Sequence, residues 1–157
     1  MKIWLGLLRV KQWYKNLLVF LPLIFIGGLF DYRSFLLTLV AFVSLCFVSS
    51  AGYIINDIKD RKLDKNHPEK KLRPIASGLV SPGKALVIAF LLLLAALSIA
   101  FLISNLFMYS VMVLFLMMLI YTFWLKKETF ADIIVISFDF VIRAVSGAFV
   151  VNVPISP

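Results

Sequence analysis

Cysteine and histidine are almost absent from this sequence, since each occurs only once among its 157 residues. The lone cysteine, Cys46, excludes a disulfide within the chain, and we expect it to pack inside an apolar segment. His67 has no other histidine or cysteine near it, so we expect no zinc site and interpret His67 as a loop residue rather than a catalytic one. Acidic side chains are also scarce, with eight Asp and Glu against sixteen Lys and Arg. A site that needs carboxylates therefore has few places to form.

Long polar stretches are lacking as well, apart from residues 59–82. Hydrophobic residues make up 62% of the chain and its mean hydropathy is +1.02, whereas soluble domains are roughly 45–50% apolar. Several apolar runs approach the ~20 residues that cross a bilayer. They predict an all-α fold, a polytopic transmembrane helical bundle, with five spans at about residues 13–30, 34–56, 83–103, 106–125 and 130–153. We expect a single membrane domain over residues 1–157, with a long cytoplasmic loop at 59–82.

The distribution of positive charge predicts how the bundle is oriented. The N-terminal stretch, the loop after the second span and the turn after the fourth span are rich in Lys and Arg, whereas the opposite connections offer only Arg33. The positive-inside rule then places the N-terminus and the loop on the cytoplasmic side, in an integral protein of the plasma membrane. The net charge of +8 favours an anionic partner, which we expect to be anionic lipid or a phosphorylated substrate rather than nucleic acid.

Residues 2–15 and the start of the third span contain sequence patterns that predict local structure. Residues 2–15 mix tryptophan and leucine with four cations, which predicts a short amphipathic helix in the membrane interface, although a plain anchor with snorkelling lysines fits equally well. We expect no cleavable signal peptide, because Arg9 ends a short apolar stretch. Ser81 and Pro82 predict the N-cap and first residue of the third span.

An acidic motif lies where the second apolar run ends. Asn56, Asp57, Asp60 and Asp64 fall within about 100° of one another on a helix, so they share one face. Carboxylates gathered near a helix C-terminus repel the helix dipole and each other unless a cation offsets them, and Mg²⁺ is the divalent ion that suits such oxygen ligands. The competing interpretation is a solvated helix end whose acids pair with Lys59, Arg61 and Lys62.

Charged residues also occur at membrane depth in the last span. Asp132, Asp139 and Arg143 are spaced by seven and four residues, which places them on one helical face beside Ser146. Asp139 and Arg143 form an i,i+4 pair that can fix helix packing by itself. Ionisable groups inside a membrane also mark functional cavities, so Arg143 is a candidate for binding a phosphate.

The acidic motif, at the cytoplasmic end of the second span, resembles the first aspartate-rich motif of the UbiA superfamily of membrane prenyltransferases. Four further stretches are similar to the branch that transfers phosphoribosyl groups to decaprenyl phosphate and related lipids. These stretches are residues 9–16, 67–78, 121–126 and 140–144, with Val10 where that branch has proline. The resemblance implies a cavity inside about nine membrane-spanning helices and a second acidic motif on a later loop. The present sequence resembles the N-terminal half, so we expect a missing C-terminal half or a partner chain.

The resemblance also implies a set of site residues. Mg²⁺ would be held by Asn56, Asp57, Asp60 and Asp64, and the three carboxylates together with Arg73 would form the catalytic group. Arg73 offers a planar fork for a phosphate, and Lys126 is the second choice. Further substrate contacts are expected from Asn56, Lys11, Lys15 and Arg143, the two lysines meeting the phosphate of a lipid acceptor.

Three functions remain open from the sequence. The first is Mg²⁺-dependent transfer of a phosphoribosyl group from phosphoribosyl diphosphate to a polyprenyl phosphate. The second is transfer of a prenyl chain from a polyprenyl diphosphate to an aromatic or quinone-precursor acceptor. The third is a non-catalytic membrane subunit or transporter fragment that uses Asp139 and Arg143 as a coupling pair.

Overall fold

The computed structural model describes residues 2–127 and 130–152, without the side chains of residues 2, 127, 131 and 132. This part of the chain is helical and contains no strand, which confirms the predicted all-α fold. Its long helices are α3 (Tyr32–Lys65), α4 (Pro82–Ile103), α5 (Asn105–Phe123) and α6 (Ala131–Val150). Each of the four has a stretch long and apolar enough to cross a membrane.

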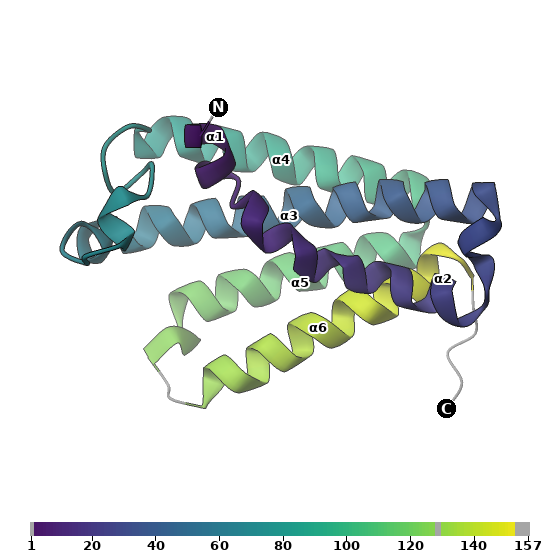
Figure 1. Cartoon of the computed structure of the whole chain (residues 1–157). Helices are drawn as coiled ribbons and strands as arrows, with labels where there is room; N and C mark the ends of the chain where they lie inside the picture. Colours follow the sequence, from purple (N-terminus) through teal and green to yellow (C-terminus); the bar gives the residue numbers. More distant parts are fainter. Residues whose placement is uncertain (1, 128–129, 153–157) are drawn as a thin grey trace.

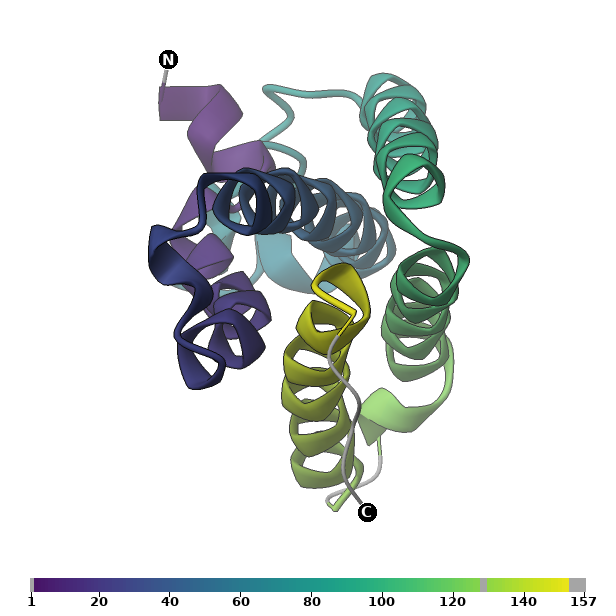
Figure 2. The same cartoon turned by 90° about the vertical axis from the view of Figure 1, so that its right-hand side faces the viewer.

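The helices form a bundle in which α3 is central (Figures 1 and 2). Helix α3 packs against α4, α5 and α6, and against the N-terminal segment. The start of the chain, the α3–α4 loop and the end of α5 lie at the same end of the bundle, whereas α6 finishes at the other end (Figure 1). The cation-rich segments therefore share one end, as predicted. We keep their cytoplasmic location as a prediction.

The first predicted span, at 13–30, differs from the prediction because it is not one long α-helix. It consists of the 3-10 helix η1 (Val10–Phe20), the short helix α2 (Leu21–Phe25) and the 3-10 turn η2 (Gly28–Phe30). Pro22 stands in the first turn of α2, and Gly27 adopts the left-handed conformation just after it. Because a 3-10 helix rises about 2.0 Å per residue, this segment still runs along much of the bundle (Figure 1).

The predicted amphipathic helix over residues 2–15 is also wrong in its extent. Helix α1 covers only Lys2–Leu7, and Arg9 adopts a left-handed conformation with φ 49° before η1 begins. A left-handed residue breaks an α-helix. The break turns the Arg9 side chain toward α3, where it meets a carboxylate described below.

The starts of the long helices follow the sequence signals. Ser81 accepts a hydrogen bond from the backbone N–H of Lys84, and Pro82 is the first residue of α4, as predicted. Ser104 caps α5 through the N–H of Phe107. Asp31 caps α3 through the N–H of Ser34, and hydrogen bonds from Ser34 lower the pKa of Asp31 below its ordinary value.

Helix α3 continues well past the predicted end of its span. It remains helical through Lys65, so the loop that was predicted at 59–82 begins only at Asn66. Residues 57–65 of α3, about two and a half turns, project beyond the predicted apolar span and carry the three carboxylates of the acidic motif. Lys62 and Lys65 in its final turn interact favourably with the negative end of the helix dipole. Between α3 and α4 the loop contains the 3-10 turn η3 (Lys70–Leu72), and η4 (Leu125–Lys127) follows α5.

The interior contains small and polar residues where helices approach closely. Ser44 of α3 donates a hydrogen bond to the carbonyl of Ala96 in α4 at 2.8 Å, and both residues are buried. Large apolar side chains, among them Phe90 and Leu102, are exposed instead. An apolar exterior over a small-residue interior is typical of helices packed in lipid.

A close backbone approach occurs at Gly147, where α6 crosses η1. A Cβ atom on Gly147 would lie 2.1 Å from the carbonyl oxygen of Val19, so a larger residue must push the two backbones apart. Overpacking of this kind typically costs about 1–3 kcal/mol. We predict that Gly147→Ala lowers the thermal midpoint of the purified protein in detergent. Gly83→Ala is the matched control, because nothing lies within 4 Å of that position, and equal midpoints for both variants would contradict the prediction.

Candidate functional site

The three carboxylates of the acidic motif are buried on one face of α3. Asp57, Asp60 and Asp64 are 3%, 6% and 4% exposed, although they lie in the part of α3 that extends beyond its apolar span. The shared helical face that the spacing predicted is confirmed. The interpretation of the motif as a solvated helix end is wrong, because these side chains are covered by other segments of the chain.

Cations from distant segments neutralise the carboxylates. Arg9 contacts both oxygens of Asp57, with Nε 3.3 Å from Oδ2 and Nη2 against Oδ1. Nη1 of Arg73 lies 3.1 Å from Oδ1 of Asp57 and 2.7 Å from Oδ2 of Asp64, so one guanidinium bridges two acids.

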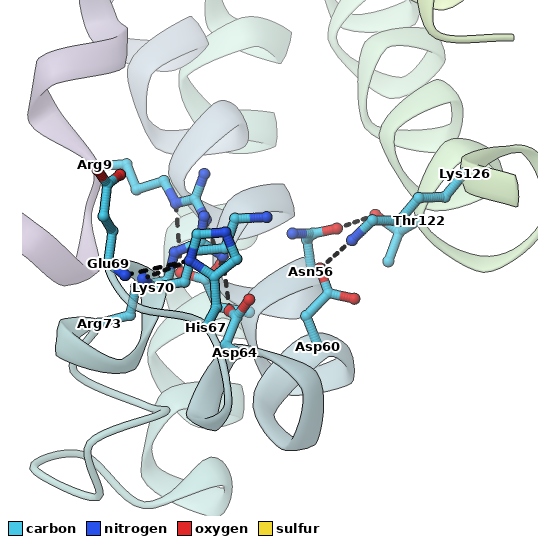
Figure 3. A network of polar contacts seen from close by, with 11 residues as sticks. Arg9, Asn56, Asp60, Asp64, His67, Glu69, Lys70, Arg73, Thr122 and Lys126 are labelled. Carbon is cyan, nitrogen blue, oxygen red and sulfur yellow. Dashed lines mark hydrogen bonds and ion pairs between the residues drawn. The ribbon is translucent and has the colours of Figure 1, made fainter. Parts of the chain in front are cut away.

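The third carboxylate has a separate partner. Lys126, beyond the end of α5, contacts Oδ2 of Asp60. Figure 3 shows two groups around the motif, with Arg9, Arg73 and Asp64 on one side and Asp60, Asn56 and Lys126 on the other. The local partners Lys59, Arg61 and Lys62 that the sequence offered make none of these ion pairs.

A cavity of about 300 Å³ opens beside the motif, and we call it the central cavity. Among its lining residues, five carry positive charge and two carry carboxylates: Arg9, Lys15, Lys70, Arg73, Lys126, Asp60 and Asp139. Within the described part of the chain, the ammonium groups of Lys15 and Lys70 have no ion pair. The central cavity therefore has an excess of positive charge, which favours an anion that carries several charges.

Polar and aromatic groups complete the wall of the central cavity. Oδ1 of Asn56 accepts a hydrogen bond from the Thr122 hydroxyl at 3.5 Å. Lys59 donates to the carbonyls of Thr122 and Phe123 at the end of α5, which ties that end to α3. The guanidinium of Arg9 lies 5.0 Å from the centre of the Tyr53 ring, within the range of a cation–π contact.

The fit of Mg²⁺ can be judged from the oxygen ligands. Mg²⁺ commonly takes one or two carboxylates, with waters and substrate phosphates completing its shell. Asn56 and Asp60 offer suitable oxygens and both line the central cavity. Among the described residues, no three Asp, Glu, His or Cys side chains are grouped to hold one ion, so the expected convergence of the whole motif on one point is not seen. The residues fit an ion shared with phosphate oxygens, and the metal-binding roles of Asn56, Asp57, Asp60 and Asp64 stay predictions.

The structure brings most of the predicted site residues together. Arg73, Lys126, Lys15 and Asn56 all line the central cavity. Lys11 lines a second cavity instead. His67 is an exposed loop residue whose Nδ1 accepts hydrogen bonds from two backbone N–H groups of the loop, as expected of a structural residue.

Arg143, like Lys11, is a predicted substrate contact that does not line the central cavity. It is 1% exposed and its Nε donates to Oδ1 of Asn16 at 2.8 Å, while Nη1 lies 3.3 Å from Oδ2 of Asp139. Asn16 in turn contacts Cys46 and Ser49 of α3. Arg143 thus joins η1, α3 and α6 within the bundle, which supports its alternative role in helix packing. The side chain of Asp132 lies outside the described residues.

Sequence reasoning missed two basic residues of the site. Arg9 was grouped with the membrane-surface cations, and Lys70 was one of many loop lysines. No local pattern distinguishes either residue, because Arg9 reaches Asp57 across 48 positions of the chain. The only available signal was the similarity of residues 9–16 and 67–78 to one family branch.

Comparison with known sequences identifies relatives of this chain. The profile of the UbiA prenyltransferase family matches residues 17–157. A decaprenyl-phosphate phosphoribosyltransferase from Mycolicibacterium smegmatis is 38% identical over 152 residues, covering 94% of this chain and 48% of the relative. The chain therefore spans about half the length of this relative.

Solved structures share the fold. A digeranylgeranylglyceryl phosphate synthase aligns with a TM-score of 0.81 and 24% identity, covering 97% of this chain and 55% of that one. A UbiA homologue from Archaeoglobus fulgidus bound to DMAPP and Mg²⁺ aligns with a TM-score of 0.79 and 20% identity, covering 98% of this chain and 56% of that one. At these identities the likeness concerns the fold alone.

Proposed function

This chain belongs to the UbiA prenyltransferase family, and we propose that it forms the donor-binding half of a Mg²⁺-dependent membrane transferase. In this proposal the enzyme moves a phosphoribosyl group from phosphoribosyl diphosphate to a polyprenyl phosphate. The relative from Mycolicibacterium smegmatis, named a decaprenyl-phosphate phosphoribosyltransferase, supports that choice of substrates. A further part of the protein, either its C-terminal half or a partner chain, completes the cavity and supplies a second acidic motif.

One observation carries the proposal. The central cavity brings five cationic side chains to the carboxylate face of α3, and Lys15 and Lys70 form no ion pair among the described residues. Unpaired ammonium groups beside buried carboxylates suit a ligand that brings both phosphate oxygens and a divalent cation. A sugar phosphate with a diphosphate leaving group meets that description.

In this proposal, different residues of the central cavity contact the donor phosphates and the metal ion. Lys15 and Lys70 contact the phosphate oxygens of the donor as it enters. Arg73 and Lys126 turn from their carboxylates toward the phosphates, where the planar fork of Arg73 binds two oxygens at once. This exchange releases Asp60 and Asp64 as oxygen ligands, with Asn56 beside them, and Asp57 becomes a ligand when Arg9 also turns toward the phosphates. When bound there, Mg²⁺ neutralises the charge that develops on the departing diphosphate.

The reaction itself is a substitution at a sugar carbon. An oxygen of the lipid phosphate forms a bond to the anomeric carbon of phosphoribosyl diphosphate. The bond between that carbon and the diphosphate oxygen breaks, and the diphosphate leaves with the electron pair. Positioning the two reactants in a cavity that excludes water accounts for much of the rate enhancement in such a step.

A second candidate is prenyl transfer to an aromatic or quinone-precursor acceptor. The wall of the central cavity also contains Met118, Val135 and Ile136, an apolar surface that suits an isoprenoid. The Archaeoglobus fulgidus homologue bound to DMAPP and Mg²⁺ supports this alternative.

Supplying each candidate donor substrate separately distinguishes the two proposed functions. We expect the complete gene product, in nanodiscs with Mg²⁺, to form a lipid-linked phosphoribosyl product from phosphoribosyl diphosphate and polyprenyl phosphate. Radiolabelled donor followed into the lipid fraction measures this product. If label enters only from an allylic prenyl diphosphate, with an aromatic acceptor present, the phosphoribosyl proposal is wrong and the second candidate replaces it.

A further inference from the structure

A second cavity lies on the N-terminal side of the site, and we call it the N-terminal cavity. Its volume is about 720 Å³, and its lining residues come from α1, the start of η1 and the loop: Leu5, Gly6, Arg9, Val10, Lys11, Gln12 and Arg73. Arg9 and Arg73 also line the central cavity. These two arginines and the carboxylate of Asp57 that links them therefore lie between the two cavities.

Two lysines of η1 line different cavities. Lys11 lines the N-terminal cavity and Lys15 lines the central cavity. Both belong to η1, a 3-10 helix with about three residues per turn, so side chains four positions apart point in directions roughly 120° apart. Because Lys11 has no ion pair among the described residues, the N-terminal cavity also has positive charge that no carboxylate offsets.

The surroundings of the N-terminal cavity are apolar. Ile3, Trp4 and Leu5 of α1 are all exposed, and Leu5 reaches the cavity wall. Exposed apolar side chains next to cations are typical of segments that lie in the membrane interface. A ligand with an anionic head and a long apolar tail matches this combination of cavity and helix better than a small soluble anion does.

We propose that the N-terminal cavity binds the phosphomonoester head group of a long-chain isoprenoid lipid, with Lys11 as its specific contact. The lipid tail leaves the cavity past Leu5 toward the membrane. Arg9 and Arg73 face this head group from one side and the occupant of the central cavity from the other. The identity of the lipid as the acceptor rests on the proposed function, whereas the binding site itself does not.

A kinetic comparison of two matched variants tests the assignment. In the complete gene product, Lys11→Gln is expected to raise KM for polyprenyl phosphate about tenfold and to leave KM for the soluble donor unchanged. Lys15→Gln is expected to do the reverse, and Lys11→Arg should restore the wild-type lipid KM. If Lys11→Gln leaves the lipid KM unchanged, or raises the donor KM instead, the assignment is overturned.

A binding measurement tests the lipid site independently of the proposed transferase function. Phosphatidylcholine nanodiscs that contain the protein are titrated with a long-chain polyprenyl phosphate, without donor or Mg²⁺, and tryptophan fluorescence is followed. We expect about tenfold weaker binding for Lys11→Gln than for the wild type and for Lys15→Gln. Such a result supports the site even if no phosphoribosyl transfer is ever detected. Equal lipid binding by all three proteins contradicts it.

Inorganic phosphate distinguishes the lipid from a free anion. In the same titration it is expected to bind the wild type far more weakly than the lipid does, because it lacks the tail that contacts α1. Binding of inorganic phosphate as tight as that of the lipid, with the same loss in Lys11→Gln, would overturn the lipid assignment in favour of a soluble phosphate.

Discussion

Asp60→Asn in the complete gene product is expected to reduce turnover by at least ~100-fold, since loss of groups that only orient a metal ligand already costs 10–100-fold. Asp60 lines the central cavity and has Lys126 as its ion-pair partner. Asparagine has nearly the same shape but carries no charge, so the substitution removes an anionic oxygen ligand without leaving a hole. Lys126 is partly exposed and can be solvated without its partner, so we expect the variant to remain folded.

Product formation in nanodiscs measures the effect, and Asp31→Asn is the matched control. Asp31 caps the opposite end of α3 and is exposed, so its substitution should leave turnover close to that of the wild type. A rate for Asp60→Asn within twofold of the wild type, with normal thermal unfolding, would refute the role of Asp60 in catalysis.

The second large effect is expected at Arg73, where lysine keeps the charge but loses the planar fork. One nitrogen of Arg73 bridges Asp57 and Asp64, and in our proposal the same group binds the donor phosphates. Hydrogen bonds between charged groups contribute about 1.5–3 kcal/mol, so kcat/KM for the donor should fall roughly 10–100-fold in Arg73→Lys.

An Arg-to-Lys substitution at an exposed position shows whether loss of the planar guanidinium affects activity only at residue 73. Arg33→Lys changes an exposed arginine near the start of α3 and is expected to have no effect on kcat/KM. If Arg73→Lys behaves like Arg33→Lys, charge alone is sufficient at position 73 and the bidentate contact is not used.

The sequence predicted the long helices well because local rules decide them. The apolar runs, together with Ser81 and Pro82 at the start of α4, predicted where α4 and α5 begin, since capping and burial in lipid act within a few residues. The shared face of Asp57, Asp60 and Asp64 follows from helical geometry alone. These features need no knowledge of distant contacts.

The features that the sequence did not predict depend on contacts between distant parts of the chain. The loop predicted to begin at residue 59 begins only at Asn66. The carboxylates of α3 contact Arg9, Arg73 and Lys126, none of which lies within α3. The break at Arg9 accompanies its contact with Asp57, 48 positions away. The contact of Arg143 with Asn16 joins segments 127 positions apart, whereas its contact with a phosphate stays a prediction. No local pattern reports such tertiary contacts.

The central claim is that the carboxylate face of α3 binds a divalent cation together with a phosphorylated ligand. Thermal unfolding of the complete gene product with Mg²⁺ alone, inorganic diphosphate alone, and both together tests it most directly, because ligands that bind cooperatively stabilise a protein by more than the sum of their separate effects. We predict a midpoint shift with both that exceeds this sum, and loss of the excess in Asp60→Asn. A full shift with Mg²⁺ alone, or an excess that persists in Asp60→Asn, would contradict the account and favour a cation-binding subunit without transferase chemistry.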